Sequence, residues 1–115
     1  MRTLRLLNLH CNKTDNHNND NNTKPDEAFL TVDNGSFRGF GPESMMNGSD
    51  GNVNADIQFN EQAVISFYDE DLVRNLSIIK HSSNHIVEEN EIHDGLKKVS
   101  FATSNANYIL SYEII

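Results

Sequence analysis

The sequence predicts an all-β fold, a two-sheet antiparallel β-sandwich of about eight strands. Apolar and polar side chains alternate with a period of two in most segments, whereas helical periodicity is nearly absent. Turn-forming residues separate these segments at short intervals, which is typical of a sandwich. The chain of 115 residues has 37% hydrophobic residues and no Trp, so its core must rest on aliphatic, Phe and Tyr side chains. A chain of this length forms one domain with its own core, and we assign residues 1–115 to it.

The first third of the chain predicts three strands and one long polar loop. Residues 12–25 are rich in Asn and contain no aliphatic or aromatic side chain, so they predict a polar loop that is mobile without a bound ion. A second strand, "EAFLTV", leads into "DNGS", where Asn34 and Gly35 predict a two-residue type I′ turn before the strand "SFRGF". Residues 41–51 predict a loop. The first strand covers residues 2–11, and its alternation places Leu4 and Leu6 on one face and Arg5, Leu7, Leu9 and Cys11 on the other.

The remaining strands alternate more regularly. A short turn at Asn60 and Glu61 is expected between the strands "NVNADIQF" and "AVISFY". Weaker strands are expected around "LSIIK" and "HIVEE". Gly95 suits the turn "HDG", because glycine adopts the backbone conformation that such a turn requires. The segments "KKVSFAT" and "NYILSYEII" complete the fold. The inward positions predict a core that contains Val53, Ala55, Ile57, Phe59, Ile65, Phe67, Val99, Phe101, Tyr108, Leu110 and Tyr112.

The net charge of −8 excludes several classes of function. Nucleic-acid binding requires clustered Lys and Arg, but the nine basic residues here are scattered. An anionic membrane repels such a protein unless a cation intervenes.

We identify neither a signal peptide nor a transmembrane segment, and the single Cys11 excludes an internal disulfide. The sequence thus predicts a soluble protein for which a cytoplasmic location is favoured.

Three consecutive carboxylates, Asp69, Glu70 and Asp71, follow the strand "AVISFY". At a strand end, Asp69 and Asp71 can turn toward one ion while Glu70 points away. Ca²⁺ requires six to eight oxygen ligands, which Asp, Glu and Asn side chains supply, and a bound cation relieves the repulsion between adjacent carboxylates. Asp20 in the Asn-rich loop and Asp26 directly after it are candidates to complete the shell. The competing interpretation is a solvated acidic turn, or a charged strand edge that blocks aggregation.

Three segments resemble C2 domains. "PDEAFLTV" is similar to the "D-P-Y-V-x-V" strand of that family, Asn60 and Glu61 are similar to its Asn-Glu pair, and "AVISFYDED" resembles the strand that carries its "D-x-D" motif. The resemblance implies an eight-stranded sandwich that binds Ca²⁺ between two loops and docks on phospholipid. It also implies that the metal ligands are Asp20, Asp26, Asp69 and Asp71.

We therefore interpret the chain as a non-enzymatic, weakly calcium-binding module that docks on a phospholipid membrane surface or a protein partner. The alternatives are a calcium-independent protein-interaction module with a solvated acidic loop face, and a hydrolase. No Ser, Cys or His lies in a recognisable arrangement with an oriented base, so the sequence does not favour an enzyme. His81 and His85 have zinc-like spacing only on a helix, and "HSSNH" predicts exposed loop histidines instead.

Overall fold

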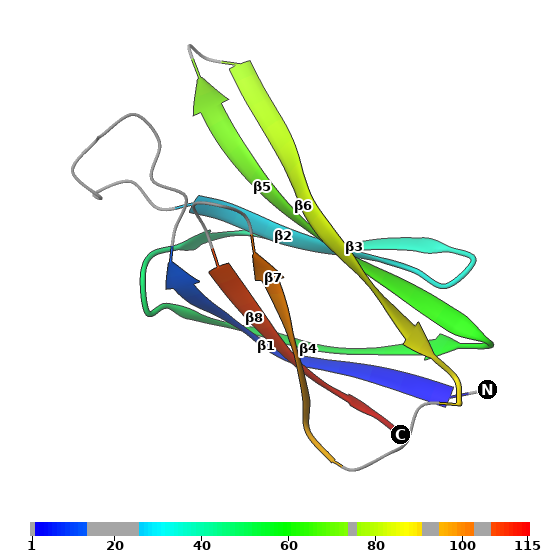
Figure 1. Ribbon diagram of the computed structural model, residues 1–115. Helices are drawn as coiled ribbons and strands as arrows, with labels where there is room; N and C mark the ends of the chain where they lie inside the picture. The colour runs from blue at the N-terminus through cyan, green and yellow to red at the C-terminus, as the bar shows by residue number, and fades with distance from the viewer. Residues whose placement is uncertain (1, 14–25, 74–75, 91–94, 103–106) are drawn as a thin grey trace.

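A computed structural model describes residues 2–13, 26–73, 76–90, 95–102 and 107–115. These residues form eight antiparallel strands and no helix, so the all-β prediction is confirmed (Figure 1). Among the described residues, no helix is long and apolar enough to cross a membrane. The strands are β1 (Arg2–Lys13), β2 (Asp26–Asp33), β3 (Phe37–Met45), β4 (Asp50–Phe59), β5 (Gln62–Val73), β6 (Leu76–Glu88), β7 (Lys97–Ala102) and β8 (Asn107–Ile114).

The strands form two four-stranded sheets. Sheet A has the order β4-β1-β8-β7, and sheet B has the order β3-β2-β5-β6. The chain crosses from sheet A to sheet B at the turn between β4 and β5, where Glu61 adopts a positive φ of 62°. The edge strands β3 and β4 lie on one side of the sandwich and β6 and β7 on the other.

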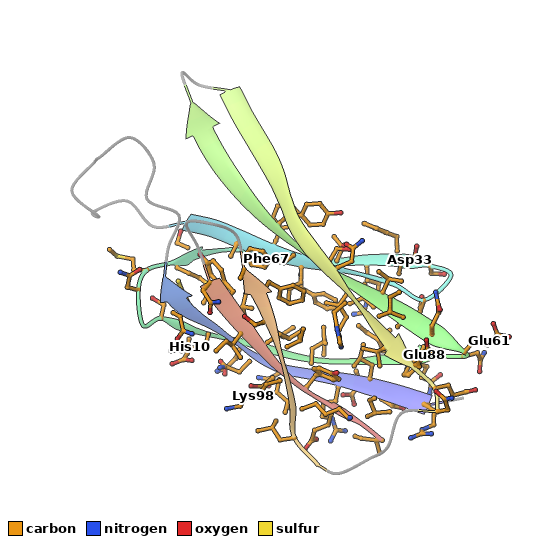
Figure 2. The ribbon with its side chains drawn as sticks, in the orientation of Figure 1. His10, Asp33, Glu61, Phe67, Glu88 and Lys98 are labelled. Carbon is orange, nitrogen blue, oxygen red and sulfur yellow. The ribbon has the colours of Figure 1, made fainter. Side chains whose placement is uncertain are left out.

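The core lies between the sheets, as Figure 2 shows for Phe67. The ring of Phe67, from sheet B, contacts two rings of sheet A, with centroid distances of 5.7 Å to Phe101 and 4.5 Å to Tyr108. Most of the expected core is buried, whereas Val53 and Ala55 on β4 and Val99 on β7 are only half-buried. The confirmed core residues are Ile57, Phe59, Ile65, Phe67, Phe101, Tyr108, Leu110 and Tyr112.

The expected faces of β1 are wrong in its second half. The pairing of β1 with β4 and with β8 shifts in register between Leu6 and Asn8. Relative to β8, Leu7 is an extra residue in β1. Such a bulge reverses the alternation. As a result Leu4 and Leu6 share the core with Leu9 and Cys11, although simple alternation separates the two pairs.

Three boundaries also differ from the expectations. Asn12 and Lys13 belong to β1, and residues 14–25, the rest of the Asn-rich segment, lie outside the described residues. The β2–β3 connection has three residues, because Asp33 pairs with Phe37, so the predicted two-residue turn is wrong. The strand β3 continues through residues 41–45, which we expected in a loop.

The strand β6 is continuous over 13 residues, where the sequence predicts two weaker strands. "HSSNH" therefore lies within a strand, and the prediction of exposed loop histidines is wrong. His85 pairs with the fully buried Ile65 and is half-buried. A bulge between the pairs Phe67–Ser83 and Tyr68–His81 absorbs one extra residue of β6 and lets the strand continue.

Candidate functional site

The predicted calcium ligands lie on two neighbouring strands and on the Asn-rich segment. Asp26 is the first residue of β2, and Asp69 and Asp71 belong to β5. Asp20 lies outside the described residues, and the side chains of the other three are not among those described. The carboxylate positions of the predicted site are therefore untested, and the ligand assignment stays a prediction.

The expectation that Asp69 to Asp71 leave the strand is wrong. β5 continues to Val73, and its pairing with β6 includes Asp69 with Lys80 and Asp71 with Ile78. The described pairing of β5 with β2 ends at Glu70. Beyond that point β5 and β6 project from the sheet as a two-stranded hairpin (Figure 1). The acidic triplet thus occupies the base of a projecting hairpin and not a loop.

The register of sheet B brings three of the predicted ligand positions to one place. Ala28 pairs with Asp69, and Glu27 pairs with Glu70, so Asp26 and Asp71 are the next positions along the two strands. Ala28 is buried in the core, as is Met45, the partner of Asp26 in β3. By strand alternation, positions 26, 69 and 71 belong to the core-facing side of sheet B, whereas Glu27 and Glu70 belong to the opposite side.

A described acidic residue, Asp50, begins β4 at the same end of the sandwich. Its Oδ1 lies 2.7 Å from Nδ1 of His10, the residue with which it pairs in β1, and accepts a hydrogen bond of 3.0 Å from Nδ2 of Asn8. The hydrogen bonds from Asn8 and then from His10 lower the pKa of the Asp50 carboxyl. Sequence reasoning did not single out this cluster, because Asp50 is 42 residues from Asn8 and 40 from His10.

The turn between β3 and β4 is hydrogen-bonded to the end of β1. The amide of Gly48, which has a φ of 84°, donates to the carbonyl of Cys11 at 2.7 Å, and the amide of Cys11 donates to the carbonyl of Ser49 at 2.8 Å. Ser49 also closes the turn, since its hydroxyl accepts from the amide of Met46 at 3.0 Å. These bonds order the backbone beside the point where the Asn-rich segment begins.

A second ionic contact lies on the outer face of sheet A. Arg5 donates from Nε and Nη2 to the two carboxylate oxygens of Asp56, at 2.8 and 3.1 Å, and this pairing lowers the pKa of Asp56. Both side chains are exposed, so we assign the pair to strand register and not to a site. Among the described side chains, no group of three or more His, Cys, Asp or Glu residues could hold a metal ion.

An open hollow of about 600 Å³ lies at the other end of the sandwich, where Figure 2 shows Glu61 and Glu88. Its lining also includes Arg2, Glu89 and Asn90, and Nη1 of Arg2 donates to the carbonyl of Glu89 at 2.6 Å. The hollow is shallow and mostly polar, and it lies far along β5 from Asp69 and Asp71. It is therefore separate from the predicted calcium site.

No family model matches the chain, and no curated protein matches it. Among solved structures it is similar to the human GIVD cytosolic phospholipase A2, with a TM-score of 0.59 and 15% identity over 99% of this chain. It is also similar to the same enzyme in complex with methyl gamma-linolenyl fluorophosphonate inhibitor and terbium chloride, with a TM-score of 0.52 and 12% identity over 98% of this chain. The chain spans only 16% and 17% of those two chains. At these identities, the similarity shows a common fold.

Proposed function

We propose that this chain is a C2-like, non-catalytic module that binds Ca²⁺ at Asp26, Asp69 and Asp71 and docks on a membrane or protein partner. The observation that carries the proposal is the register of β2 and β5, which brings the three positions together on one side of sheet B. Asp20, from the adjoining Asn-rich segment, completes the shell in this proposal.

Electrostatics favours a cation at these positions. Neighbouring carboxylates on paired strands repel one another, and this repulsion disfavours their ionised forms unless an opposite charge lies nearby. The chain already has a net charge of −8, so its negative field further increases the free-energy cost of ionising these carboxylates. Ca²⁺ neutralises such a group directly and accepts irregular oxygen geometry. Magnesium is a poorer fit, since its octahedral shell is tighter.

The two similar structures support a lipid surface as the partner. Both are of a phospholipase, and one complex contains terbium chloride, whose terbium ion is a hard trivalent cation that prefers oxygen ligands. For this chain a bound cation also has an electrostatic role. Without it, the negative protein is repelled from an anionic leaflet, and with it the repulsion is locally reversed.

Calcium-dependent thermal stabilisation tests the metal site. We expect a dissociation constant of roughly 10⁻⁵ to 10⁻³ M, the range of sites with few charged ligands and little rigidity. At 100 times that constant, binding to the native state alone adds about 2.7 kcal/mol to the free energy of unfolding. A flat melting temperature, together with no heat of binding in calorimetry at such concentrations, would reject calcium and favour the calcium-independent interaction module.

Vesicle sedimentation tests the docking step separately. Vesicles of phosphatidylcholine with and without phosphatidylserine are mixed with the protein in calcium or in a chelator. Calcium-dependent sedimentation with the phosphatidylserine vesicles supports a membrane partner. If calcium stabilises the protein but neither vesicle retains it, the partner is a protein.

A further inference from the structure

The outer faces of the two sheets differ in character. An antiparallel sheet that packs on a core with one side commonly presents polar residues to solvent on the other. Sheet A follows this pattern, since its outer face carries the pair of Arg5 with Asp56 and the hydrogen-bonded amides of Asn12 and Asn107. Sheet B departs from it, because alternation and register place these apolar side chains on its outer face: Phe29, Phe37, Val64, Tyr68 and Ile86.

The apolar side chains of this face form two pairs across neighbouring strands. The rings of Phe29 in β2 and Tyr68 in β5 stack with their centroids 5.0 Å apart. Further along β5, Val64 pairs with Ile86 of β6, which is 50% exposed. Phe37, at the edge of the same face, is 69% exposed. All the described elements belong to the two sheets, so none of them covers this face, and exposed apolar side chains that share a face indicate a contact surface.

The row between the two apolar pairs is made of small polar residues. Thr31 and Ser66 pair with each other and are only 6% and 8% exposed. The hydroxyl of Ser66 donates to Oδ1 of Asn84 in β6 at 2.6 Å. A partner can therefore cover Ser66 without leaving its hydroxyl unpaired, which keeps the cost of desolvating the centre of the face low.

Carboxylates flank both apolar pairs. Asp33 and Glu88 are exposed, are the last residues of β2 and β6, and lie at outward positions beside Val64 and Ile86 (Figure 2). The register assigns Glu27 and Glu70 to the same side of the sheet, beyond Phe29 and Tyr68. The face is thus acidic at both ends.

The basic residues in the described parts of sheet B belong to its other side. Arg38 of β3 pairs with the buried Val32, and Lys80 of β6 pairs with Asp69, so both positions belong to the core-facing side. The described outward positions of the sheet therefore carry acidic residues and no Lys or Arg. Such a face attracts a cationic partner and repels an anionic membrane or a second copy of this acidic chain.

A helix suits this face better than an extended segment. The face presents side chains and offers no backbone donors or acceptors to an extended chain, whereas a helix satisfies its own backbone. Val64 and Tyr68, one from each apolar pair, are about 13 Å apart along β5 at the usual strand rise. That distance corresponds to about nine residues of a helix, which repeats its apolar positions on one side over such a length.

We propose that the outer face of sheet B binds a cationic amphipathic helix of a partner protein. The apolar side of the helix covers the pairs Phe29–Tyr68 and Val64–Ile86, and its Lys or Arg residues lie opposite the flanking carboxylates. The site is independent of the proposed calcium function, because positions 26, 69 and 71 belong to the core-facing side of the sheet. Binding requires no metal.

The test is calorimetric titration of the full chain, in a calcium chelator, with synthetic peptides of about 14 residues. One peptide has Leu and Lys in the pattern of an amphipathic helix, one is a scrambled peptide of the same composition, and one has Glu in place of Lys. We expect saturable binding of the first peptide alone. Its largest amide chemical shift changes should map to Phe29, Val64, Tyr68 and Ile86.

Two isoleucines provide a matched pair of variants that leaves the net charge unchanged. Ile86 is 50% exposed on the proposed face, and Ile115 is 54% exposed at the end of the chain. Ile86→Ser should weaken binding of the Leu/Lys peptide at least about fivefold, whereas Ile115→Ser should leave it unchanged. This comparison separates contact with the face from general attraction between a basic peptide and an acidic protein.

The proposal is overturned if the wild-type protein shows no saturable binding, or if the scrambled or the Glu peptide binds equally well. It is also overturned if the two isoleucine variants bind alike, or if the shift changes map to the outer face of sheet A. Shift changes at the same four residues on concentrating the protein alone would assign the face to a second copy of the chain and reject the helix.

Discussion

The ring nitrogen Nε2 of His85 lies 3.0 Å from the hydroxyl oxygen of Tyr112, and this contact joins the two sheets across the edge of the core. His85 comes from β6 in sheet B and Tyr112 from β8 in sheet A, with ring centroids 5.8 Å apart. The Tyr112 side chain is only 3% exposed, so its hydroxyl has little access to water. This polar contact therefore links β6 of sheet B to β8 of sheet A.

Tyr112→Phe should lower the free energy of unfolding by about 1 kcal/mol, because it removes a part-buried hydrogen bond while keeping the ring. Urea denaturation of the two single variants, Tyr112→Phe and His85→Phe, and of the double variant measures their coupling. We expect an interaction energy of at least about 0.5 kcal/mol, as found for residues in direct contact. Strictly additive effects would show that the contact contributes nothing to stability.

Phe67→Ala should lower the free energy of unfolding by roughly 3–5 kcal/mol, since it leaves a cavity in a core where Phe67 contacts two aromatic rings. Phe37→Ala is the matched control, because Phe37 is 69% exposed and should change stability by less than about 0.5 kcal/mol. Chemical denaturation measures both. Equal losses would contradict the position of Phe67 between the sheets.

Asp69→Asn combined with Asp71→Asn should abolish the calcium-dependent rise in melting temperature. The calcium-free protein should become more stable, because the repulsion between the carboxylates is removed. Glu70→Gln is the control for charge. Position 70 pairs with Glu27 and belongs to the opposite side of the sheet from positions 69 and 71, so this variant should keep the calcium-dependent rise in melting temperature. Retention of calcium binding by the double variant would remove these two residues from the site.

Asp50 should contribute to stability at neutral pH and lose that contribution in acid. Its folded pKa is lowered by Asn8 and His10, so its stabilisation is complete above the unfolded value of about 3.9 and disappears as the pH falls through the folded value. Urea midpoints of wild type and Asp50→Asn, measured from pH 7 to pH 2, should differ at neutral pH, and the difference should begin to shrink at about pH 4 and disappear below the folded pKa. A difference independent of pH would show that the carboxylate charge is not involved.

Glu61→Gly should stabilise the protein, because Glu61 has a positive φ of 62° that glycine adopts without steric cost. The free energy released by removing this backbone strain exceeds the entropic cost of a more flexible unfolded chain. We expect the free energy of unfolding to rise by about 0.5–1 kcal/mol. Glu61→Ala keeps a Cβ and should give no such gain. A melting temperature raised equally by both variants would point to the removed charge and not to the backbone.

Local patterns were sufficient for most of the fold. Alternation depends only on the chemistry of neighbouring side chains, and it predicted the sandwich and the inward positions of β4, β5 and β8. It failed at Leu7, where one extra residue in β1 changes which side chains reach the core. It also divided β6 in two, because "HSSNH" contains no apolar residue at the inward positions. His85 nevertheless faces the core, since Tyr112 of the other sheet supplies a polar partner.

The sequence by itself determined that the protein is an acidic all-β domain with carboxylates near the end of a strand. Only the tertiary structure decided which of them become neighbours, because strand register joins residues as distant in sequence as Ala28 and Asp69. It also decided that the acidic triplet lies within β5 and not in a loop. The physical reason is that bulges and cross-sheet packing depend on how two sheets fit together, whereas alternation records only how each strand divides its side chains between two faces.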